Sequence, residues 1–353
     1  MCCKAFDFGD GDGGLATPSD YDSQMYAPAY NAGARIFSNS WGSVGTAHVT
    51  EFMHVTSISR SPYVCVGSYS TGTTWIGSLY DSDAIMMDTL IYDYGDALVL
   101  FAAGNNGGYA TTDDTTGDHS ILDPGTSKNV LTIGAAETET APDTVADFSS
   151  RGPTTDFRIK PELCGPGDPI YSTSSAGSPG NATCKVALKS GTSMATPAVA
   201  GAAALLRQFL VDRKHEVYSS AGYAGSNYSI SRPSSALLKA MLIGSTTPLI
   251  SGYDSSGYSV TLADFYSEAS PVADAAAYPL GTTGVDYHQG FGHVLLSNAL
   301  SLDGGFDTFL YESSLEAYGS FTLEFFVTST TTEIDITLVW TDPPGSTCKA
   351  YKY

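Results

Sequence analysis

Apolar positions along the first part of the chain follow two spacings, and each spacing predicts a different element. Residues with helical spacing alternate with short, continuously apolar runs bounded by polar turns. The predicted elements are a helix over 23–32 with Gly33 as its C-cap, a strand over 34–39, a helix over 84–94, and strands over 97–102 and 129–134. Helices that alternate with continuously apolar strands indicate a parallel sheet covered on both faces.

The later part of the chain changes character after Gly305. Small and apolar residues predict a central helix over 193–211, with Pro197 in its first turn, and a further helix over 234–244. Residues 321–327 and 333–340 instead alternate with period two, as antiparallel strands do. We therefore expect an α/β domain over 1–304 and the start of an antiparallel β-sandwich over 305–353. Two or three strands cannot close a sandwich, so we expect this second domain to be incomplete.

Residues 45–79 interrupt this pattern, because they show neither clear periodicity nor turn punctuation. The segment is long for a connection inside a compact domain, so it reads as an insertion, either a surface loop or a retained non-coding segment.

Composition narrows the functional classes. The chain has 353 residues, 42% of them hydrophobic, as in an ordinary soluble globular protein. Its 37 acidic residues against 16 basic ones give a net charge of −21, which disfavours nucleic acid and anionic membranes as partners. The longest apolar run, 198–206, is closed by Arg207 and is far shorter than the roughly 20 residues of a membrane-spanning helix.

Cysteine spacing and the acidic N-terminal loop name no set of metal ligands, so the metal sites stay unassigned. The six cysteines lack the paired spacing of zinc ligands, and Asp7, Asp10 and Asp12 do not fit an EF-hand, whose twelfth position here is Tyr21. A disulfide between Cys164 and Cys184 would staple the Gly-, Ser- and Pro-containing segment between them. Sequons at Asn181 and Asn227 weakly favour export, although the first residues contain no apolar signal-peptide region.

The chemistry begins with residues 191–197, GTSMATP, where a loop turns into the central helix. Ser193 at this point would lie in the positive field of the helix N-terminus, which favours a nucleophile that carries developing negative charge. Taken alone, the same serine is more commonly an N-cap. Extended to Gly201, however, the string resembles the nucleophile motif of the subtilisin-like serine proteases almost letter for letter.

Further segments resemble that family in the same order along the chain. Residues 39–42, NSWG, resemble the strand end that lines the substrate cleft, which assigns Ser40, Trp41 and Gly42 to substrate binding. Residues 102–107, AAGNNG, resemble the oxyanion segment, which implies Asn105 as the oxyanion donor and places Ala103 and Gly104 beside the substrate. The stretches 148–153, 158–162 and 165–167 are similar to the segment that leads to the nucleophile helix. Residues 289–292 and 338–342 resemble members with a C-terminal β-sandwich.

The resemblance also implies an Asp and a His-Gly-Thr motif before the strand that ends at Asn39, and this chain has neither. Its histidines all lie elsewhere: His48, His54, His119, His215, His288 and His293. An acyl-transfer site needs a base as well as a nucleophile and oxyanion donors. We therefore expect a truncated subtilase that acts on a protein or peptide substrate and needs no cofactor for its chemistry. Resemblance to the family also implies export, and it is compatible with a structural calcium whose ligands are unassigned. The alternatives are a pseudoenzyme or residual fragment that at most binds peptides, and a purely structural β-sandwich protein, which would explain only the last fifty or so residues.

Overall fold

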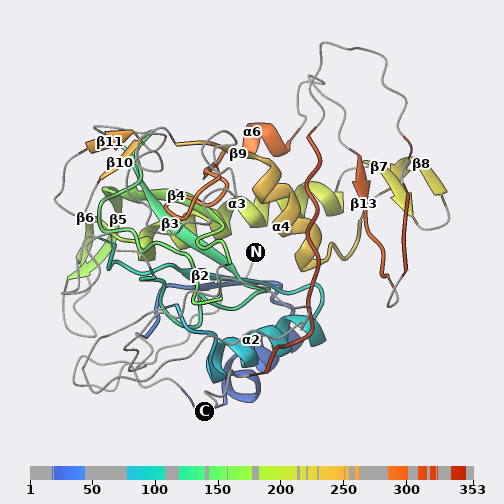
Figure 1. The fold of residues 1–353 in the computed structure, drawn as a ribbon, viewed down its shortest axis with the longest axis horizontal. Coiled ribbons are helices and arrows are strands. Elements are labelled where there is room, and N and C mark those ends of the chain that lie inside the picture. Colours follow the sequence, from blue (N-terminus) through green and yellow to red (C-terminus); the bar gives the residue numbers. More distant parts are fainter. Residues whose placement is uncertain are drawn as a thin grey trace, which may run out of the picture.

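A computed structural model describes residues 18, 20–43, 78–107, 119–139, 143–156, 158–176, 183–212, 215–219, 222–228, 230–249, 251–253, 259–261, 285–300, 309–315, 319–322, 324 and 335–346. Its centre is a six-stranded sheet in the order β1-β2-β3-β4-β12-β9 (Figure 1). The strands are β1 (Ile36–Asn39), β2 (Leu98–Ala102), β3 (Leu131–Glu137), β4 (Leu163–Asp168), β12 (His293–Val294) and β9 (Thr246–Thr247). All neighbours pair in parallel except β9, which runs antiparallel to β12. The predicted parallel sheet is confirmed.

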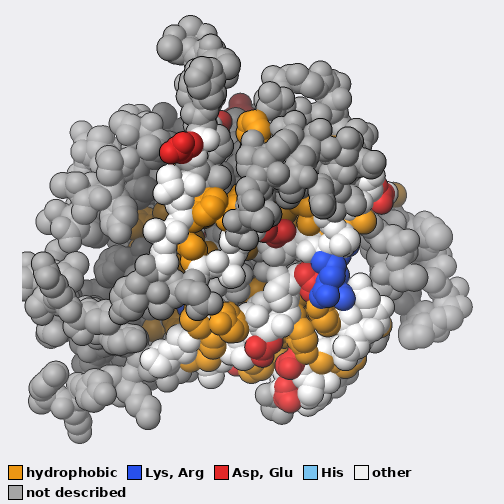
Figure 2. All heavy atoms as spheres, turned by 90° about the vertical axis from the view of Figure 1, so that its right-hand side faces the viewer, with side chains coloured by type: hydrophobic (Ala, Val, Ile, Leu, Met, Phe, Trp, Pro, Cys, Tyr) orange, Lys and Arg blue, Asp and Glu red, His pale blue; other side chains and the backbone are white. Residues whose placement is uncertain are grey.

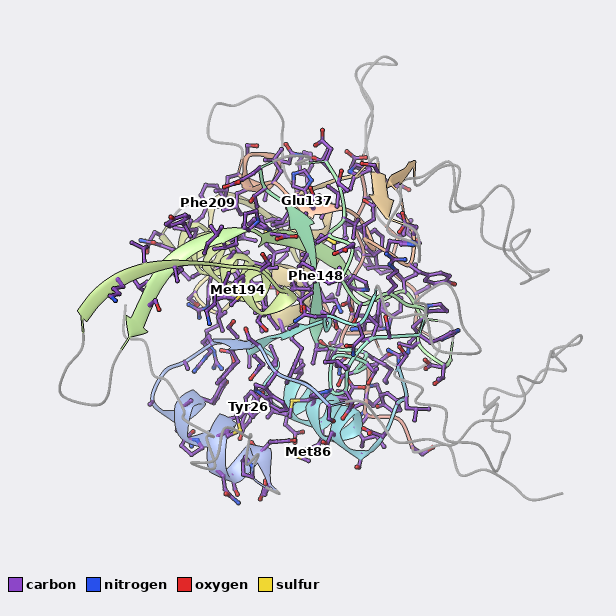
Figure 3. The ribbon with its side chains drawn as sticks, turned by 90° about the vertical axis from the view of Figure 1, so that its left-hand side faces the viewer. Tyr26, Met86, Glu137, Phe148, Met194 and Phe209 are labelled. Atoms are coloured by element: carbon purple, nitrogen blue, oxygen red, sulfur yellow. The ribbon has the colours of Figure 1, made fainter. Side chains whose placement is uncertain are left out.

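Helices cover both faces of this sheet (Figure 1). One layer holds η1 (Asp22–Tyr26), α1 (Ala27–Asn31) and α2 (Ser82–Asp93), and the other holds α3 (Thr192–Asp212), α4 (Ser235–Gly244) and α6 (Leu296–Ala299). Figure 3 shows Tyr26 and Met86 on the first layer and Met194 at the start of α3 on the second. The helices predicted from apolar spacing therefore all form, and the first is divided into η1 and α1.

Strand β2 shows why its sequence is apolar at every position. Leu98 and Leu100 pack in the cluster that contains residues of α3 and α4, whereas Val99 and Phe101 pack in the cluster that contains residues of η1 and α2. Successive side chains of a strand point to opposite faces, and here both faces are covered.

Three smaller sheets lie outside the pattern that the sequence predicts. They comprise a hairpin of β5 (Ile170–Ala176) and β6 (Thr183–Lys189), a pair of β10 (Ser251–Tyr253) and β11 (Ser259–Thr261), and a sheet of β7 (His215–Ser219), β8 (Gly222–Tyr228) and β13 (Leu310–Tyr311). The sequence of β5, IYSTSSA, is mostly small and polar, so it gives no period-two signal of the usual kind.

The strand predicted over 333–340 does not form in the part that the structure describes, since residues 335–346 belong to no helix or strand. The alternation still decides which side chains face the protein. Val339 packs against the main core, whereas Ile336, Leu338 and Trp340 are 76%, 76% and 65% exposed. Beyond them, Asp342 N–H donates to Asn129 Oδ1 at 2.9 Å. The segment therefore lies on the α/β unit as an extended strap with an exposed apolar side.

Helix α3 meets the length and hydropathy of a membrane span, with a mean hydropathy of 1.4 over its most apolar window. The apolar run 198–206 is shorter than this helix, because the apolar sequence resumes at Phe209, Leu210 and Val211 after Arg207 and Gln208. Val199, Ala203, Leu206 and Leu210 are fully buried against the sheet and α4, which is how the core helix of an α/β unit packs.

The predicted Cys164–Cys184 disulfide is wrong, because Cys164 is a free thiol. It is the second residue of β4 and is fully buried. A Cβ atom added at Gly134 on the neighbouring strand would come within 2.8 Å of Cys164 Sγ, so the thiol packs against the β3 backbone. Burial raises the pKa of this thiol, and the nearby Asp286 carboxylate adds to the effect.

A buried charge cluster ties β3, β4 and α4 together. Glu162 Oε1 accepts hydrogen bonds from Lys160 Nζ and Lys239 Nζ, both at 2.7 Å, and its Oε2 accepts from Thr132 N–H at 2.7 Å. Burial opposes ionisation of Glu162, but the two ammonium groups outweigh burial and hold its pKa below the ordinary value. Burial also lowers the pKa of Lys160 to about 7, although the Glu162 carboxylate counteracts part of this shift.

Residues 45–77 of the apparent insertion lie outside the described residues, and so do Asp7, Asp10 and Asp12. The segment is described again from Ser78, which is tied to the α/β unit. Its N–H donates to Ile121 O at 2.8 Å, and its hydroxyl accepts from Ile121 N–H at 3.1 Å. The end of the predicted insertion is therefore an ordered connection into α2.

Candidate active site

Three segments meet at the carboxyl-terminal edge of the parallel sheet. Residues 40–42 follow β1, residues 103–105 follow β2, and the loop before α3 is held to β4 by a hydrogen bond from Gly191 N–H to Gly167 O at 3.0 Å. Open α/β sheets bind their ligands at this edge, because the loops that leave successive strands converge there. The fold therefore brings together the segments that the sequence assigned to one site.

Ser193 lies in the first turn of α3 and is joined twice to Ser40. Ser40 Oγ donates to Ser193 O at 2.9 Å, and Ser193 Oγ donates to Ser40 O at 3.4 Å. The first bond attaches the segment after β1 to the start of α3. The second is long, so the Ser193 hydroxyl is held only loosely and its oxygen stays available.

Asn105 is anchored through its side-chain oxygen. Oδ1 accepts from Thr192 N–H and from Thr192 Oγ1, both at 2.9 Å. This pairing fixes which end of the amide is the donor end. A Cβ atom added at Gly191 would lie 3.4 Å from Asn105 Nδ2 and 3.6 Å from Oδ1, so the whole amide lies against the loop that precedes Ser193. Within the described part of the chain, Nδ2 has no hydrogen-bond acceptor.

A second donor lies at the start of α3. The amides of Met194 and Ala195 donate to Gly191 O, and that of Thr192 donates to Asn105. No described residue accepts from Ser193 N–H. The first amides of a helix have no partner within the helix, and their N–H groups carry its positive end. Ser193 N–H and Asn105 Nδ2 are thus two available donors on the two segments that flank the Ser193 hydroxyl.

The five residues predicted to bind substrate have different roles in the structure. Ser40 and Gly42 are at least partly exposed at the cleft edge, and Gly104 has a φ of +113°, a conformation that favours glycine. Trp41 instead packs its ring against Phe101 and Tyr21, at centroid separations of 5.1 and 5.4 Å, so its side chain belongs to the core below.

Ala103 supports the site from below. Its side chain is fully buried, its N–H donates to Ile133 O at 2.9 Å, and its carbonyl accepts from Leu122 N–H at 2.9 Å. These hydrogen bonds of Ala103 therefore hold the segment after β2 against β3 and link it to the segment that contains Leu122.

The structure brings no described acid or base to the Ser193 hydroxyl, whose recorded partner is Ser40 O. Among the candidate histidines, His48 and His54 lie outside the described residues. His293 belongs to β12, between β4 and β9, and His288 lies just before this strand beside Asp286, with Nδ1 3.6 Å from Asp286 Oδ1. Neither of these two has a recorded contact with the nucleophile.

Three neighbouring carboxyl groups, those of Asp123, Asp81 and Asp83, lie close to this edge of the sheet. Asp123 is 2% exposed, its Oδ1 accepts from Thr126 Oγ1 at 3.3 Å, and its Oδ2 has no hydrogen-bond donor. Burial, together with the neighbouring Asp81 and Asp83, raises the pKa of Asp123 to about 9. The described residues hold no group of three or more His, Cys, Asp or Glu side chains suited to a metal ion.

Two features of this site escaped sequence reasoning. Thr192, the residue that orients Asn105, stands directly before the nucleophile in the recognised motif, so its position was visible but its role was not. Leu122 approaches both Gly42 and Gly104, and no motif marks it.

A serine at a helix N-terminus, flanked by an anchored amide donor at the edge of a parallel sheet, defines the nucleophile side of a serine hydrolase site. The sequence profile described as "Subtilase family" (Peptidase S8) matches residues 7–292. The chain belongs to the subtilase family, and by family it is a serine protease.

Curated relatives agree with this assignment. The chain is 29% identical over 308 residues to a serine protease/ABC transporter B family protein, tagD, of Dictyostelium discoideum, which covers 64% of this chain and 15% of that protein. It is 39% identical over 122 residues to the serine protease AprX of Bacillus subtilis, covering 31% and 26% respectively. The chain thus spans well under a third of either relative.

Among solved structures, the chain is similar to that of the prenylagaramide maturation protease PagA. The sequence identity is 20%, the TM-score is 0.44, and the match covers 82% of this chain and 68% of that one.

Proposed function

We propose that this chain supplies the nucleophile, the oxyanion donors and part of the peptide-binding cleft of a serine endopeptidase. In this reaction Ser193 Oγ attacks the scissile carbonyl and forms an acyl-enzyme, while Asn105 Nδ2 and Ser193 N–H donate to the oxygen that becomes negative. The observation that carries the proposal is the double anchoring of Asn105 Oδ1 by Thr192, because it fixes the amide beside Ser193 and leaves Nδ2 as its available donor. Donors fixed in advance stabilise the transition state without reorganisation.

The general base comes, on this proposal, from a segment outside the described residues. Two surfaces support this view. Strand β1 is paired only with β2 in the described sheet, and α3 has an outward face of small and apolar residues that includes Pro197, Ala198, Gly201 and Leu205, the last 55% exposed. Apolar helix faces and strand edges are normally covered in a folded domain. A segment that carries the Asp and His of the family motif would cover both surfaces and reach Ser193.

An inactive peptide-binding module is the second candidate function. The absence of any described acid or base at the Ser193 hydroxyl favours it. The two candidates are separated by reading the complete transcript that encodes residues 1–353: Asp and His-Gly-Thr motifs ahead of Asn39 favour the protease, and a transcript without them favours the module. Export remains a prediction under either candidate.

Activity measurements on the full-length protein test the mechanism. A fluorophosphonate should label Ser193, and Ser193→Ala should abolish both labelling and peptide hydrolysis. Asn105→Ala should lower kcat about 10²- to 10³-fold with little change in KM, as expected for the loss of one oxyanion donor. Asn106→Ala is the matched control on the same loop and should leave kcat near the wild-type value. Full activity in a folded Ser193→Ala protein would overturn the nucleophile assignment.

A further inference from the structure

Leu122 fills the space between the two segments of the cleft. A Cβ atom added at Gly42 would lie 2.8 Å from Leu122 Cβ, and one added at Gly104 would lie 2.6 Å from Leu122 Cγ. Real Cβ atoms are not found that close to other heavy atoms, so both glycines are needed to admit this one side chain. The two segments, which come from β1 and β2, therefore converge on Leu122.

Hydrogen bonds fix the backbone of Leu122 on both sides. Its N–H donates to Ala103 O at 2.9 Å, which ties it to the oxyanion segment. The next residue, Asp123, exchanges hydrogen bonds with Ser43 at 2.8 and 3.0 Å, which ties it to the segment that follows β1. Leu122 is only partly buried, whereas Ile121 and Asp123 on either side are buried. This alternation turns the Leu122 side chain toward the cleft and away from the core.

The position of Leu122 relative to the donors decides which part of a substrate it meets. Gly104 precedes the oxyanion donor Asn105, and Gly42 lies two residues after Ser40, which contacts Ser193. When a peptide carbonyl is held by Asn105 and Ser193, the side chain two bonds from its carbon must enter the adjoining space between the two segments. That space is bordered by Gly42, Gly104 and Leu122.

The atoms nearest to the two glycine positions carry no charge. Besides Leu122 carbons, they are the carbonyl oxygen of Asp123 and the hydroxyl of Ser150. Ser150 Oγ already accepts a hydrogen bond from Asn106 N–H at 3.1 Å. Among these nearest described atoms there is no ion-pair partner for a basic side chain, and the carbons of Leu122 occupy the room that a larger side chain would need.

We propose that Leu122 closes the pocket for the side chain of the residue whose carbonyl is attacked, and so selects substrates with glycine, alanine or serine at that position. This inference rests on the proposed function and names the substrate class of the same site. A pocket that is already filled rejects a larger side chain, because admitting it forces the surrounding groups apart.

Peptidyl phosphonates that differ only in the side chain next to the phosphorus test the inference on the full-length protein. The wild type should be inactivated at least tenfold faster by the alanine analogue than by the phenylalanine analogue. Leu122→Ala should raise the phenylalanine rate relative to the alanine rate by at least tenfold. Leu122→Met, which nearly conserves volume, should keep the wild-type preference and controls for damage to the fold, as does the melting temperature of each variant.

The outcomes separate this inference from the proposed function. A fluorophosphonate without a peptide reports on Ser193 alone. If it labels Ser193 but the wild type prefers the phenylalanine analogue, or if Leu122→Ala leaves the ratio unchanged in a folded protein, the role of Leu122 is wrong and the protease assignment stands. If no reagent labels Ser193 in the full-length protein, the proposed function fails and the inference falls with it.

Discussion

Thr192 holds Asn105 with two hydrogen bonds to the same oxygen, one from its amide and one from its hydroxyl, both 2.9 Å long. The hydroxyl also accepts from Gly104 N–H at 3.2 Å, so one side chain ties the nucleophile helix to the oxyanion segment. Amide orientation is thus set by the residue next to the nucleophile.

Thr192→Val should therefore lower activity without removing any group that touches the substrate. The variant keeps the shape and the amide bond of Thr192 but loses the hydroxyl. One hydrogen bond contributes about 1 kcal/mol, so kcat should fall roughly fivefold to tenfold while KM changes little. Thr192→Ser restores the hydroxyl and should recover most of the activity. A Val variant of the full-length protein as active as the wild type would show that the hydroxyl is dispensable, and a Ser variant as impaired as the Val variant would show that the hydroxyl alone does not carry the effect.

Asp123→Asn should change how stability depends on pH. The pKa of Asp123 is about 9 in the folded protein and about 3.9 when unfolded. The folded state therefore binds the proton more tightly, so this contribution to stability is complete below pH 4 and is lost as the pH rises toward 9. Asparagine is neutral at every pH, so it places no buried charge beside Asp81 and Asp83. The variant should match the wild type near pH 4 and exceed it at pH 8 by more than about 1 kcal/mol in urea unfolding. A stability difference that is the same at both pH values would contradict this account.

Glu162→Gln should be strongly destabilising, because it leaves Lys160 and Lys239 buried without their common carboxylate. Breaking a buried ion pair costs about 3–5 kcal/mol. The pKa of Glu162 is lowered on folding, so its contribution is complete above pH 4.3 and is lost as the pH falls through the folded value. The gap between variant and wild type in urea unfolding should therefore narrow in acid.

The matched control for Glu162→Gln is Asp156→Asn. Asp156 Oδ2 pairs with Arg158 Nε at 2.8 Å, with both side chains partly exposed. An exposed pair contributes less than about 1 kcal/mol. A similar loss in both variants would mean that burial of the Glu162 cluster has no special importance.

Cys164 should be unreactive in the native protein and free on unfolding. Its thiol is buried and its pKa is raised, so little thiolate is available to an alkylating reagent. Iodoacetamide should modify Cys164 only in denaturant, as peptide mapping would show. Recovery of a Cys164–Cys184 disulfide peptide from protein that was never reduced would contradict the structure.

Local sequence predicts the α/β framework well, because elements buried on both sides have a strong apolar signal. Strand β2 and helices α2, α3 and α4 lie within a few residues of their predicted ranges. The hairpin of β5 and β6 was missed, since register with a partner and not periodicity defines it. For residues 335–340 the error is the reverse, because a strand was predicted where none forms. Their apolar alternation is real, but no described strand lies beside them to complete a sheet.

Some residues of the candidate site could be predicted from the sequence, and others could not. Ser193 and Asn105 could be predicted as site residues from motifs, because the proposed chemistry demands particular residue types at particular places. Leu122 could not, since its role depends on two glycines about eighty and twenty residues away that happen to leave room for it. Cys164 misled the sequence reading, because chain proximity to Cys184 says nothing about which way a strand residue points.

Charge is spread unevenly over the surface. On the face shown in Figure 2, the basic side chains drawn in colour form one small group beside acidic ones, whereas acidic side chains appear in several places. With a net charge of −21, mutual repulsion between copies of the protein should help to keep it dispersed at low ionic strength.

The strap at 335–340 favours self-association, which that charge repulsion opposes. Its outward side chains, Ile336, Leu338 and Trp340, form an exposed apolar strip along an extended backbone. Two protein chains readily associate through such a surface. Raising the salt concentration screens the charge repulsion between copies of the protein but does not weaken apolar contacts through this strip. Self-association should therefore increase with salt concentration. Trp340 also makes the strip visible: an indole in water emits at long wavelength, and a blue shift of its fluorescence would signal the moment at which something covers it.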